Sequence, residues 1–357
     1  MGVGRVLVVE QASQLAERVR HRAPWLSRES GSETWLTVVR AALQLGPVLV
    51  LGLLWLVLSL LSPVFFTQQN MTNLGVQAAI VAVLAIGQLV VIVTRGIDLS
   101  VGSTLALATV TGALAYDTAL LSSGFGVIAT MIATGAAVGL VNGVIFVKGR
   151  IPHAFIVTLA TLYAARGLAL VLSGGASKPG MPPAVQTAGG GFVGDIPVPV
   201  IIVAGLGVLA SVFLTRTRWG RWIFATGGNP DAASRAGIPV GRVLISAYVI
   251  SGIAAGVAGV MTAGRTDSGF PTAGDLAELD AIAAAIIGGA SLFGGRGNVA
   301  NAIVGALILA TIRNGLNLLD VNPFWQLVVI GGVILVAVQL DVLRTRIEEK
   351  LRGRAAA

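Results

Sequence analysis

The 357-residue sequence has no cysteine and only two histidines, and these absences exclude several kinds of chemistry. Without cysteine the chain can form no disulfide, no iron–sulfur cluster and no thiol nucleophile. His21 and His153 lie far apart in the sequence, and neither has a second histidine three or four positions away. The sequence therefore predicts no metal site and no catalytic residue. The phosphate-binding pattern GxxxxGKS/T is also missing, so we expect the chain to bind no cofactor and no ATP itself.

Charged residues are also scarce. They make up 11% of the chain, against about 25% in ordinary soluble domains, whereas hydrophobic residues make up 55%. The 47 glycines suit the same class of protein, because small residues let transmembrane helices pack closely. The net charge of +8 comes from basic residues that interrupt apolar runs, so it does not indicate nucleic-acid binding. The composition predicts an all-α, polytopic membrane protein.

The apolar runs predict about ten transmembrane helices, because a helix needs about 20 mostly apolar residues to cross a bilayer. The eighth run is short and interrupted by glycine, so it forms either a hairpin or a broken pair with the ninth. The expected runs are residues 44–62, 74–94, 99–117, 125–147, 154–173, 198–215, 242–263, 279–293, 298–316 and 324–341. They define a transmembrane domain at residues 43–343, between a polar N-terminal tail at 1–42 and a basic C-terminal tail at 344–357.

The distribution of basic residues predicts the orientation of these helices. With the N-terminus in the cytoplasm and ten crossings, most of the 24 Lys and Arg residues fall in cytoplasmic segments. Cytoplasmic loops of membrane proteins carry this excess of Lys and Arg. We therefore expect both termini to be cytoplasmic in a multi-pass protein of the cytoplasmic membrane.

A polar segment at residues 227–241 separates two membrane-length runs, and arginines lie on both sides of it, which predicts a cytoplasmic loop. Asn229 or Asp231 can cap a short helix in this segment, Pro230 suits its first turn, and Gly237 suits its end. Its alanines leave room for a partner protein, so the segment is either a docking helix or simply a polar connection. The candidate docking residues are Gly228, Asn229, Asp231, Ala232, Ala233, Arg235, Gly237 and Ile238.

Polar residues inside or beside the apolar runs are candidates for a translocation path. A charge at the bilayer centre costs about 2.5–3.5 kcal/mol, so Arg166 should face the helix bundle or a wet cavity. Asp98 either caps the helix that follows it or belongs to a break that shapes the path. For each candidate, contact between helices is the alternative to contact with a solute. The candidates are Asp98, Ser100, Ser103, Asn142, Arg166, Asn301, Asn314 and Asn317.

Glycines recur at every fourth position in two of the runs, at Gly135, Gly139 and Gly143 and again at Gly252 and Gly256. This spacing makes a flat strip on a helix and predicts close helix packing. The packing lies either within one subunit or between two copies of the chain.

The longest expected external connection, residues 173–197, is rich in glycine, proline and alanine. A connection of this length is usually either functional or flexible. Here it is either a simple connector or a contact for a protein that delivers solute from outside. The candidate contact residues near the external face are Lys178, Arg265, Asp275 and Glu278.

Several sequence blocks carry a family resemblance. They are GIDLSVGS at 96–103, KGRIP at 148–152, PTAG at 271–274, ELDAIAA at 278–284, GGASLFGGRG at 288–297 and NGLNLL at 314–319. With the segment from Gly228 to Ile238, these blocks follow one another over roughly residues 63–341 and resemble ribose- and xylose-type ABC sugar permeases. Asp231-Ala232-Ala233 followed by Gly237 is similar to the coupling helix by which such permeases dock their ATPase.

The resemblance implies an ABC-importer permease fold and a role as the membrane subunit of an ATP-driven bacterial importer. It implies a second permease copy, a cytoplasmic ATPase that uses ATP and Mg²⁺, and an extracytoplasmic sugar-binding protein as partners. The implied substrate is a monosaccharide, with a pentose such as ribose or xylose favoured over another sugar, a polyol or a nucleoside. The alternative function is an ion-coupled secondary transporter of a small polar solute, in which the docking segment has no role.

Overall fold

The computed structural model describes the backbone of residues 29–118, 121 and 123–356, and the side chains of residues 45–118, 121 and 123–343. The chain divides into two units, Met1–Gly46 and Pro47–Ala357. Residues 29–46 of the first unit are helical and belong to α2 (Glu29–Leu61), which contains Pro47. Most of the predicted N-terminal tail and the side chains of the predicted C-terminal tail lie outside the described residues.

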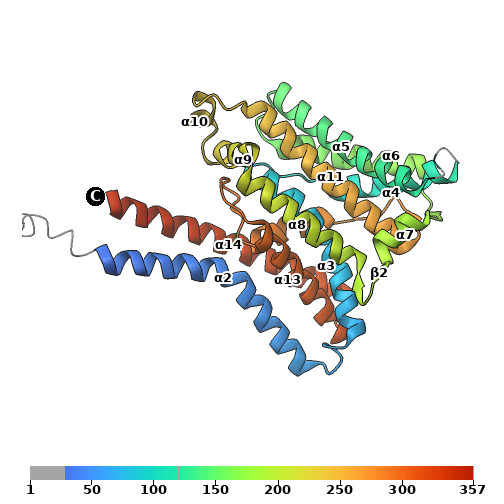
Figure 1. The fold of residues 1–357 in the computed structure, drawn as a ribbon, viewed down its shortest axis with the longest axis horizontal. Coiled ribbons are helices and arrows are strands. Elements are labelled where there is room, and N and C mark those ends of the chain that lie inside the picture. Colours follow the sequence, from blue (N-terminus) through green and yellow to red (C-terminus); the bar gives the residue numbers. More distant parts are fainter. Residues whose placement is uncertain (1–28, 119–120, 122, 357) are drawn as a thin grey trace, which may run out of the picture. The chain divides into compact units, whose positions relative to one another are not determined.

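The second unit is built almost entirely of helices (Figure 1). Two pairs of two-residue strands, β1 with β4 and β2 with β3, are antiparallel. After α2 the elements are α3 (Gln68–Val93), α4 (Val101–Asp117), α5 (Gly124–Lys148), α6 (Ala154–Ser173), β1 (Lys178–Pro179), α7 (Pro183–Gly190), β2 (Phe192–Val193), β3 (Ile196–Pro197), α8 (Val198–Arg216), α9 (Arg218–Gly228), α10 (Pro230–Arg235), α11 (Val240–Thr266), β4 (Ser268–Gly269), α12 (Ala277–Ile287), α13 (Val299–Leu318) and α14 (Pro323–Ala356).

Within the described part of the chain, seven helices are long and apolar enough to cross a membrane. They are α3, α5, α6, α8, α11, α13 and the Pro323–Leu343 part of α14. The other three expected runs are also helical: one lies in α2, whose side chains are described from Leu45 onward, and the other two are α4, with 17 residues, and α12, with 11. The chain is thus an all-α, multi-pass membrane protein, as its composition predicts.

The eighth expected run, residues 279–293, is interrupted as its glycines predict, because α12 ends at a glycine pair. Gly289 adopts a φ of +87°, and the N–H groups of Gly289 and Ala290 turn back to carbonyls of the last helical turn. This arrangement terminates α-helices. α12 then packs closely against α13, since a Cβ at Gly305 would collide with the Ala284 carbonyl. Of the two expected arrangements, the structure therefore shows the hairpin with the ninth run.

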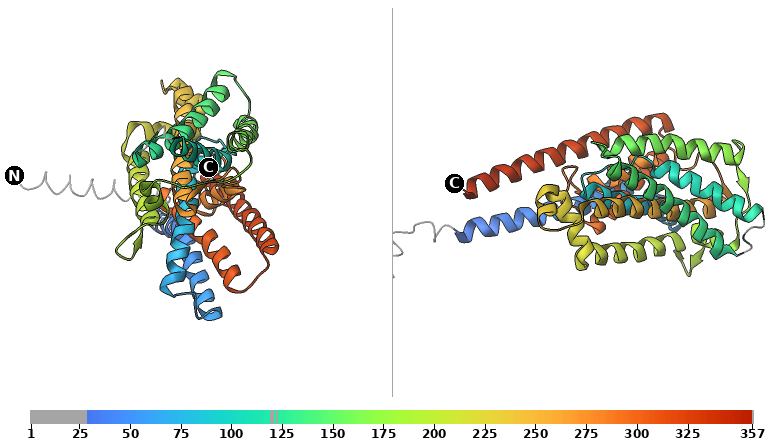
Figure 2. Two further views of the ribbon diagram at one scale, coloured as in Figure 1. Left: turned by 90° about the vertical axis from the view of Figure 1, so that its right-hand side faces the viewer. Right: turned by 90° about the horizontal axis from the view of Figure 1, so that it is seen from above.

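The interior of this unit is formed mainly by α3, α4 and α11. In α3 the most apolar 18-residue window is 83% buried, against 22% in each of α5, α6 and α8. Figures 1 and 2 show α11 running beside α5, and α11 also packs against α3, α4 and α7. The more exposed helices display large apolar side chains such as Leu209 and Val171, as expected for surfaces that meet lipid.

The two glycine strips predicted from the sequence meet each other inside one subunit. A Cβ at Gly135 would collide with the Gly252 carbonyl and approach the Gly256 nitrogen to 2.9 Å. Gly139 is equally close to the Tyr248 carbonyl on the same partner helix. The strips therefore bring the backbones of α5 and α11 together, which confirms the packing alternative within the subunit.

The external connection is folded, so the interpretation of residues 173–197 as a simple flexible connector is wrong. β1 pairs with β4, with Lys178 opposite Gly269, and β2 and β3 form a small hairpin. Helix α7 lies directly on α11, where a Cβ at Gly264 would collide with the Val185 carbonyl. The connection thus forms a structured cap over the end of α11.

Candidate functional site: a capped surface helix and a buried polar turn

The segment predicted to dock a partner contains a short helix, α10, with a well-defined start. Asn229 precedes it with an extended backbone, and its Oδ1 accepts a hydrogen bond from the Ala232 N–H at 3.0 Å. Pro230 occupies the first helical position, where no backbone donor is needed. Of the two capping residues that the sequence allows, the structure therefore selects Asn229, and Asp231 lies in the first turn instead. The negative carboxylate of Asp231 is stabilised there by the positive end of the helix dipole.

The end of α10 is equally well defined. Gly237 has a φ of +78°, its N–H donates to the Ser234 carbonyl, and the Ile238 N–H donates to the Ala233 carbonyl at 3.1 Å. These two bonds form the Schellman arrangement, which strongly favours glycine at the left-handed position. The prediction that Gly237 ends this helix is confirmed.

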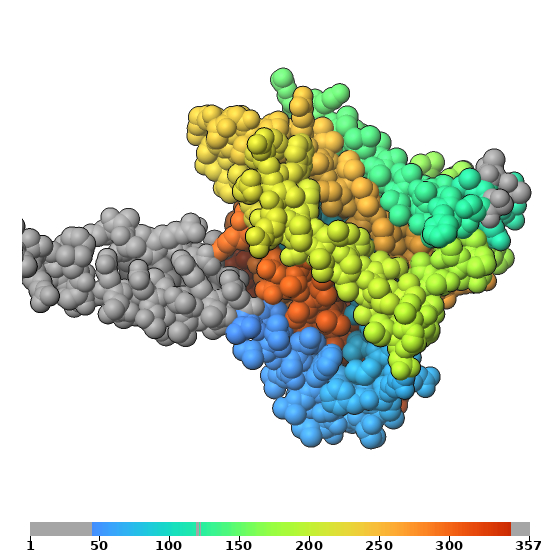
Figure 3. Space-filling model, viewed as in Figure 1, coloured from blue at the N-terminus to red at the C-terminus, as the bar shows by residue number. Residues whose placement is uncertain are grey.

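The exposed face of α10 carries most of the candidate docking residues. Gly228, Asn229, Asp231, Ala232, Arg235 and Gly237 are exposed, whereas Ala233 is buried and Ile238 partly buried. Ile238 packs against a core cluster that includes residues of α3 and α11. The space-filling view shows the α9–α10 region as a projecting surface (Figure 3). The helix is thus anchored on one side and free to meet another molecule on the other.

A second polar group surrounds Asp98, in the connection between α3 and α4. The Asp98 carboxylate accepts hydrogen bonds from the Ser100 hydroxyl at 2.7 Å, from the Ser100 N–H at 3.0 Å and from the Ser251 hydroxyl at 2.8 Å. Asn142 donates in turn to the Ser100 hydroxyl at 2.8 Å. With its amide oriented for hydrogen bonding, Gln88 donates to the Asp98 carbonyl at 3.2 Å and accepts from the Asp98 N–H at 3.1 Å.

This network ties four helices together in the interior, because its members come from α3, α5, α11 and the start of α4. Asp98 is 1% exposed, and burying a carboxylate costs free energy unless hydrogen bonds compensate it. Both oxygens of Asp98 have such partners. The Asp98 turn is therefore a fixed structural junction in this conformation, which agrees with the expected break between α3 and α4. The alternative that Asp98 caps α4 is wrong, because its carboxylate bonds to Ser100 and Ser251 and not to an N–H group in the first turn of that helix.

The remaining path candidates make other contacts. Ser103 is buried and donates to the Ser100 carbonyl of its own helix. Asn314 and Asn70 exchange two hydrogen bonds at 2.7 and 3.1 Å, which link α13 to α3. Asn317 accepts from Gln326 at 2.7 Å, between α13 and α14. The asparagine contacts each join one helix to another, whereas the Ser103 contact lies within the start of α4.

Asn301 lies in the first turn of α13, near the N-cap. Its N–H donates to the Asn298 side chain at 3.1 Å, which caps the helix. A Cβ at Gly288 would collide with the Asn301 carbonyl, so this turn of α13 packs directly on the end of α12.

Arg166 lies at the centre of a charged group beside the segment between β4 and α12. Its Nη1 donates to the Pro271 carbonyl at 2.6 Å and to the Ala273 carbonyl at 2.8 Å. The guanidinium also interacts electrostatically with Asp275 and Glu278. The expectation that this charge faces the bundle is confirmed, because it holds the segment that leads into α12.

Next to this group, Arg313 of α13 forms an ion pair with Asp280 of α12 at 2.8 Å. Asp280 is 6% exposed, so its charge depends on this partner. Sequence reasoning did not select Asp280, Ser251, Gln88 or Asn70. Each lies in a mostly apolar helix, and the nearest sequence signal was that polar residues are rare in membrane helices.

The external contact candidates divide into two kinds. Lys178 is partly exposed on β1, and Arg265 and Asp275 are exposed. Glu278 is 8% exposed, and a Cβ at Gly102 of α4 would collide with its carboxylate. Glu278 therefore lies inside the bundle and is not available to a soluble protein in this conformation.

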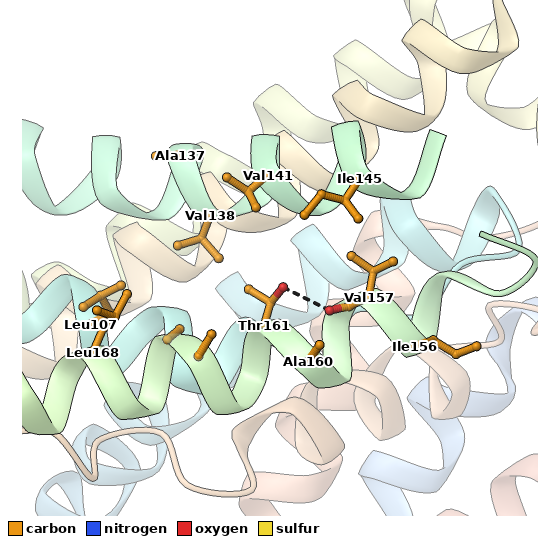
Figure 4. A pocket seen from close by; sticks show the side chains of 12 residues that line it. Leu107, Ala137, Val138, Val141, Ile145, Ile156, Val157, Ala160, Thr161 and Leu168 are labelled. Carbon is orange, nitrogen blue, oxygen red and sulfur yellow. Dashed lines mark hydrogen bonds between the residues drawn. The ribbon is translucent and has the colours of Figure 1, made fainter. Parts of the chain in front are cut away.

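An apolar groove of about 540 Å³ lies between α5 and α6, with α4 at its base (Figure 4). Among its described lining residues, Thr161 has the single polar side chain, and its hydroxyl donates to the Val157 carbonyl at 3.0 Å. A sugar needs several hydrogen-bonding partners, which this lining does not offer. The groove is suited to lipid or helix contacts rather than to a sugar.

Comparison with known proteins identifies the family of this chain. The model of the branched-chain amino acid transport system/permease component family matches residues 70–338. The ribose import permease of Escherichia coli K12 is 42% identical over 290 residues, which cover 80% of this chain and 89% of that protein. The D-allose permease of the same strain is 39% identical over 301 residues, covering 83% of this chain and 90% of that protein.

The xylose permease of Haemophilus influenzae is 33% identical over 341 residues, covering 78% of this chain and 90% of that protein. No solved structure matches the chain. The family match covers most of the sequence, including the docking helix, the Asp98 turn and the charged group around Arg166. The chain therefore belongs to the branched-chain amino acid transport system/permease component family and, within it, to the ribose/xylose-type ABC sugar permeases.

Proposed function

We propose that this chain is the membrane subunit of an ATP-driven importer that carries a monosaccharide across the bacterial cytoplasmic membrane. The observation that carries the proposal is α10: a capped, glycine-terminated helix, exposed on one face and placed between the apolar helices α8 and α11. A surface helix anchored in this way suits a cytoplasmic ATPase that binds and displaces it.

The arrangement of basic residues supports a cytoplasmic position for α10. Arg216, Arg218, Arg221 and Arg242 flank the segment, and Arg235 lies in α10 itself. Such loops stay on the cytoplasmic side. We propose that both termini share this side and that α2, α4 and α12 complete about ten helices of the membrane domain. ATP and Mg²⁺ then act in the separate ATPase, outside this chain.

The choice of substrate rests on the relatives, whose names specify ribose, allose and xylose. A pentose such as ribose or xylose is the favoured substrate of this chain. We propose that two copies enclose the path and alternate between outward and inward openings as the ATPase closes and resets. The half-buried Arg166 is the candidate whose charge lies nearest the external loops, whereas Asp98, Ser100 and Asn142 bond to one another and position helices.

On the external side, the folded cap over α11 is the proposed contact for a sugar-binding protein. Lys178 and Arg265 supply positive charge on this cap, and the exposed Asp275 lies in the connection to α12. Exposed charges of this kind mainly accelerate and orient association.

The test is uptake of labelled ribose and xylose by vesicles that contain this chain, its candidate ATPase and its candidate binding protein. Asp231→Lys and Gly237→Trp should abolish ATP-dependent uptake and binding of the ATPase. Asp195→Lys and Gly174→Trp are matched controls for binding of the ATPase alone, since both lie in the cap and not in α10: Asp195 is exposed at the β2–β3 turn, and Gly174 has a φ of +66° in open space. Uptake by the chain alone that follows a proton or sodium gradient, and is untouched by the α10 variants, would refute the proposal.

A further inference from the structure

Three segments of the chain meet where α3 ends, close to the docking helix. The Val93 carbonyl at the end of α3 accepts a hydrogen bond from the Gly295 N–H at 2.8 Å. A Cβ at Gly227, in the last turn of α9, would collide with the same Val93 carbonyl and approach the Gly295 nitrogen to 2.7 Å. The junction is therefore made by backbone against backbone, and it tolerates little independent movement of its parts.

Arg95 holds this junction from the α3 side. Its Nε donates to the Gly227 carbonyl at 2.6 Å, and its Nη2 donates to the Gly228 carbonyl at 2.5 Å. These carbonyls belong to the last turn of α9, where a helix has no backbone donors left for them. A cation at this end is also favoured by the helix dipole. The planar guanidinium satisfies both carbonyls at once, which a lysine ammonium cannot do with the same geometry.

The backbone of Arg95 is specialised as well. Arg95 has a φ of +67°, a left-handed conformation that is uncommon for residues other than glycine. The Cγ of Arg95 lies where a Cβ on Gly294 would be, so the side chain passes directly over the 294–295 turn. The turn after α3 thus directs this side chain toward the end of α9.

Arg95 lies between the two polar sites described above. On one side, Gly228 immediately precedes Asn229, the residue that caps α10. On the other side, Asp98 follows three residues after Arg95 and is bonded to Ser100 and Ser251. Arg95 therefore makes a short connection between α10 and the buried turn that joins α3, α4 and α11.

We propose that Arg95 is a positioning residue for transport, which transmits displacement of α10 by the ATPase to the Asp98 turn. The proposal rests on the proposed function, because it needs a partner that moves α10. When α10 shifts, the Gly227 and Gly228 carbonyls pull on the guanidinium, and the short 94–100 connection carries that movement to the Asp98 network. A residue that merely capped α9 would affect stability without changing how ATP use is linked to sugar movement.

The experiment compares sugar transported per ATP hydrolysed in vesicles that contain this chain with its candidate ATPase and binding protein. Arg95→Gly removes both donors and suits the positive φ. It should leave binding of the ATPase and ATP hydrolysis within about twofold of wild type, and lower sugar moved per ATP about tenfold. With Arg95→Lys, the amount of sugar moved per ATP should lie between the values for wild type and Arg95→Gly. Arg150→Gly is the matched control, because Arg150 is also exposed and has a φ of +50°.

A second measurement follows the Asp98 turn directly. The chain has no cysteine, so a single Leu99→Cys substitution accepts an environment-sensitive fluorophore without background. The fluorescence change on binding the ATPase with a non-hydrolysable ATP analogue should be present in the otherwise wild-type chain and absent with Arg95→Gly. If Arg95→Gly does not fold in the membrane, Arg95→Met, which keeps the aliphatic stem, replaces it in both assays.

Four outcomes decide between the proposals. An unchanged ratio of sugar to ATP in the Arg95 variants overturns the proposal, as does an unchanged fluorescence response. Loss of ATPase binding in those variants also overturns it, because Arg95 would then be part of the docking surface. Absence of ATP-driven uptake in the wild-type chain would instead refute the proposed function, so the two failures are distinguishable.

Discussion

The contact between α5 and α11 gives a quantitative test of the packing described above. At Gly135 an added Cβ would collide with the Gly252 carbonyl and lie 2.9 Å from the Gly256 nitrogen. Both neighbours are backbone atoms, which cannot rotate aside, so Gly135→Ala forces the two helices apart. Overpacking of this kind costs about 1–3 kcal/mol, and a rigid neighbour places the cost near the upper end.

Helix propensity works in the opposite direction, because alanine is about 1 kcal/mol better than glycine in a helix interior. Gly135→Ala should therefore destabilise the protein by about 2 kcal/mol. Gly167→Ala in α6 is the matched control, since a Cβ there has nothing within 4 Å. That variant should be neutral or up to about 1 kcal/mol more stable. The difference between the variants isolates the packing cost, because the propensity gain is common to both.

The assay is reversible unfolding in mixed micelles as the fraction of denaturing detergent rises, followed by fluorescence of the six tryptophans. Gly135→Ala should lower the free energy of unfolding, and Gly167→Ala should not. Equal shifts in the two variants would refute the reasoning, since the strip would then make no close backbone contact within the subunit. The measurement uses the isolated chain and depends on no partner.

Three further predictions follow from single contacts. Asn229→Ala removes the acceptor for the Ala232 N–H, so α10 should lose about 1 kcal/mol of local stability and the chain should bind its ATPase more weakly in a titration. Asn229→Asp, which keeps an acceptor, should restore binding. Arg313→Met leaves the buried Asp280 without its partner and should lower the unfolding free energy by about 2–3 kcal/mol. This is below the full cost of breaking a buried pair, because Arg313 keeps 34% of its side-chain surface exposed. Alanine substitutions of Asn70 and Asn314, singly and together, should give a coupling free energy of about 0.6–1.7 kcal/mol in a double-mutant cycle.

Each of these predictions has a contradicting result. Weak binding by Asn229→Asp as well as by Asn229→Ala would show that capping is not what the ATPase needs. If Arg313→Met is as stable as wild type, the prediction is contradicted, and Asp280 is then either paired with another group or protonated. Additive effects of the two asparagine substitutions would show that their hydrogen bonds add nothing specific between α3 and α13.

Much of the fold and of the docking helix was predictable because the information is local. Helix class follows from runs of apolar residues, and the start and end of α10 follow from Asn229, Pro230 and Gly237, whose backbone preferences act within one turn. The glycine strips likewise indicated close packing, because their spacing places Gly135 and Gly139 on one side of α5. Apolar length alone did not show that α12 stops at Ile287, since the Gly289 turn depends on its left-handed backbone.

The sequence by itself determined that the chain is a helical membrane protein, where its polar segments lie and how the docking helix begins and ends. These properties depend on composition and on neighbours within a few residues. The tertiary structure decided which partners the polar residues have: Ser251 for Asp98, Asp280 for Arg313, and the Gly227 and Gly228 carbonyls for Arg95. Such pairs are 33 to 153 positions apart in the chain. Only the packing of helices brings them within hydrogen-bond distance, and no periodicity in one sequence encodes that choice.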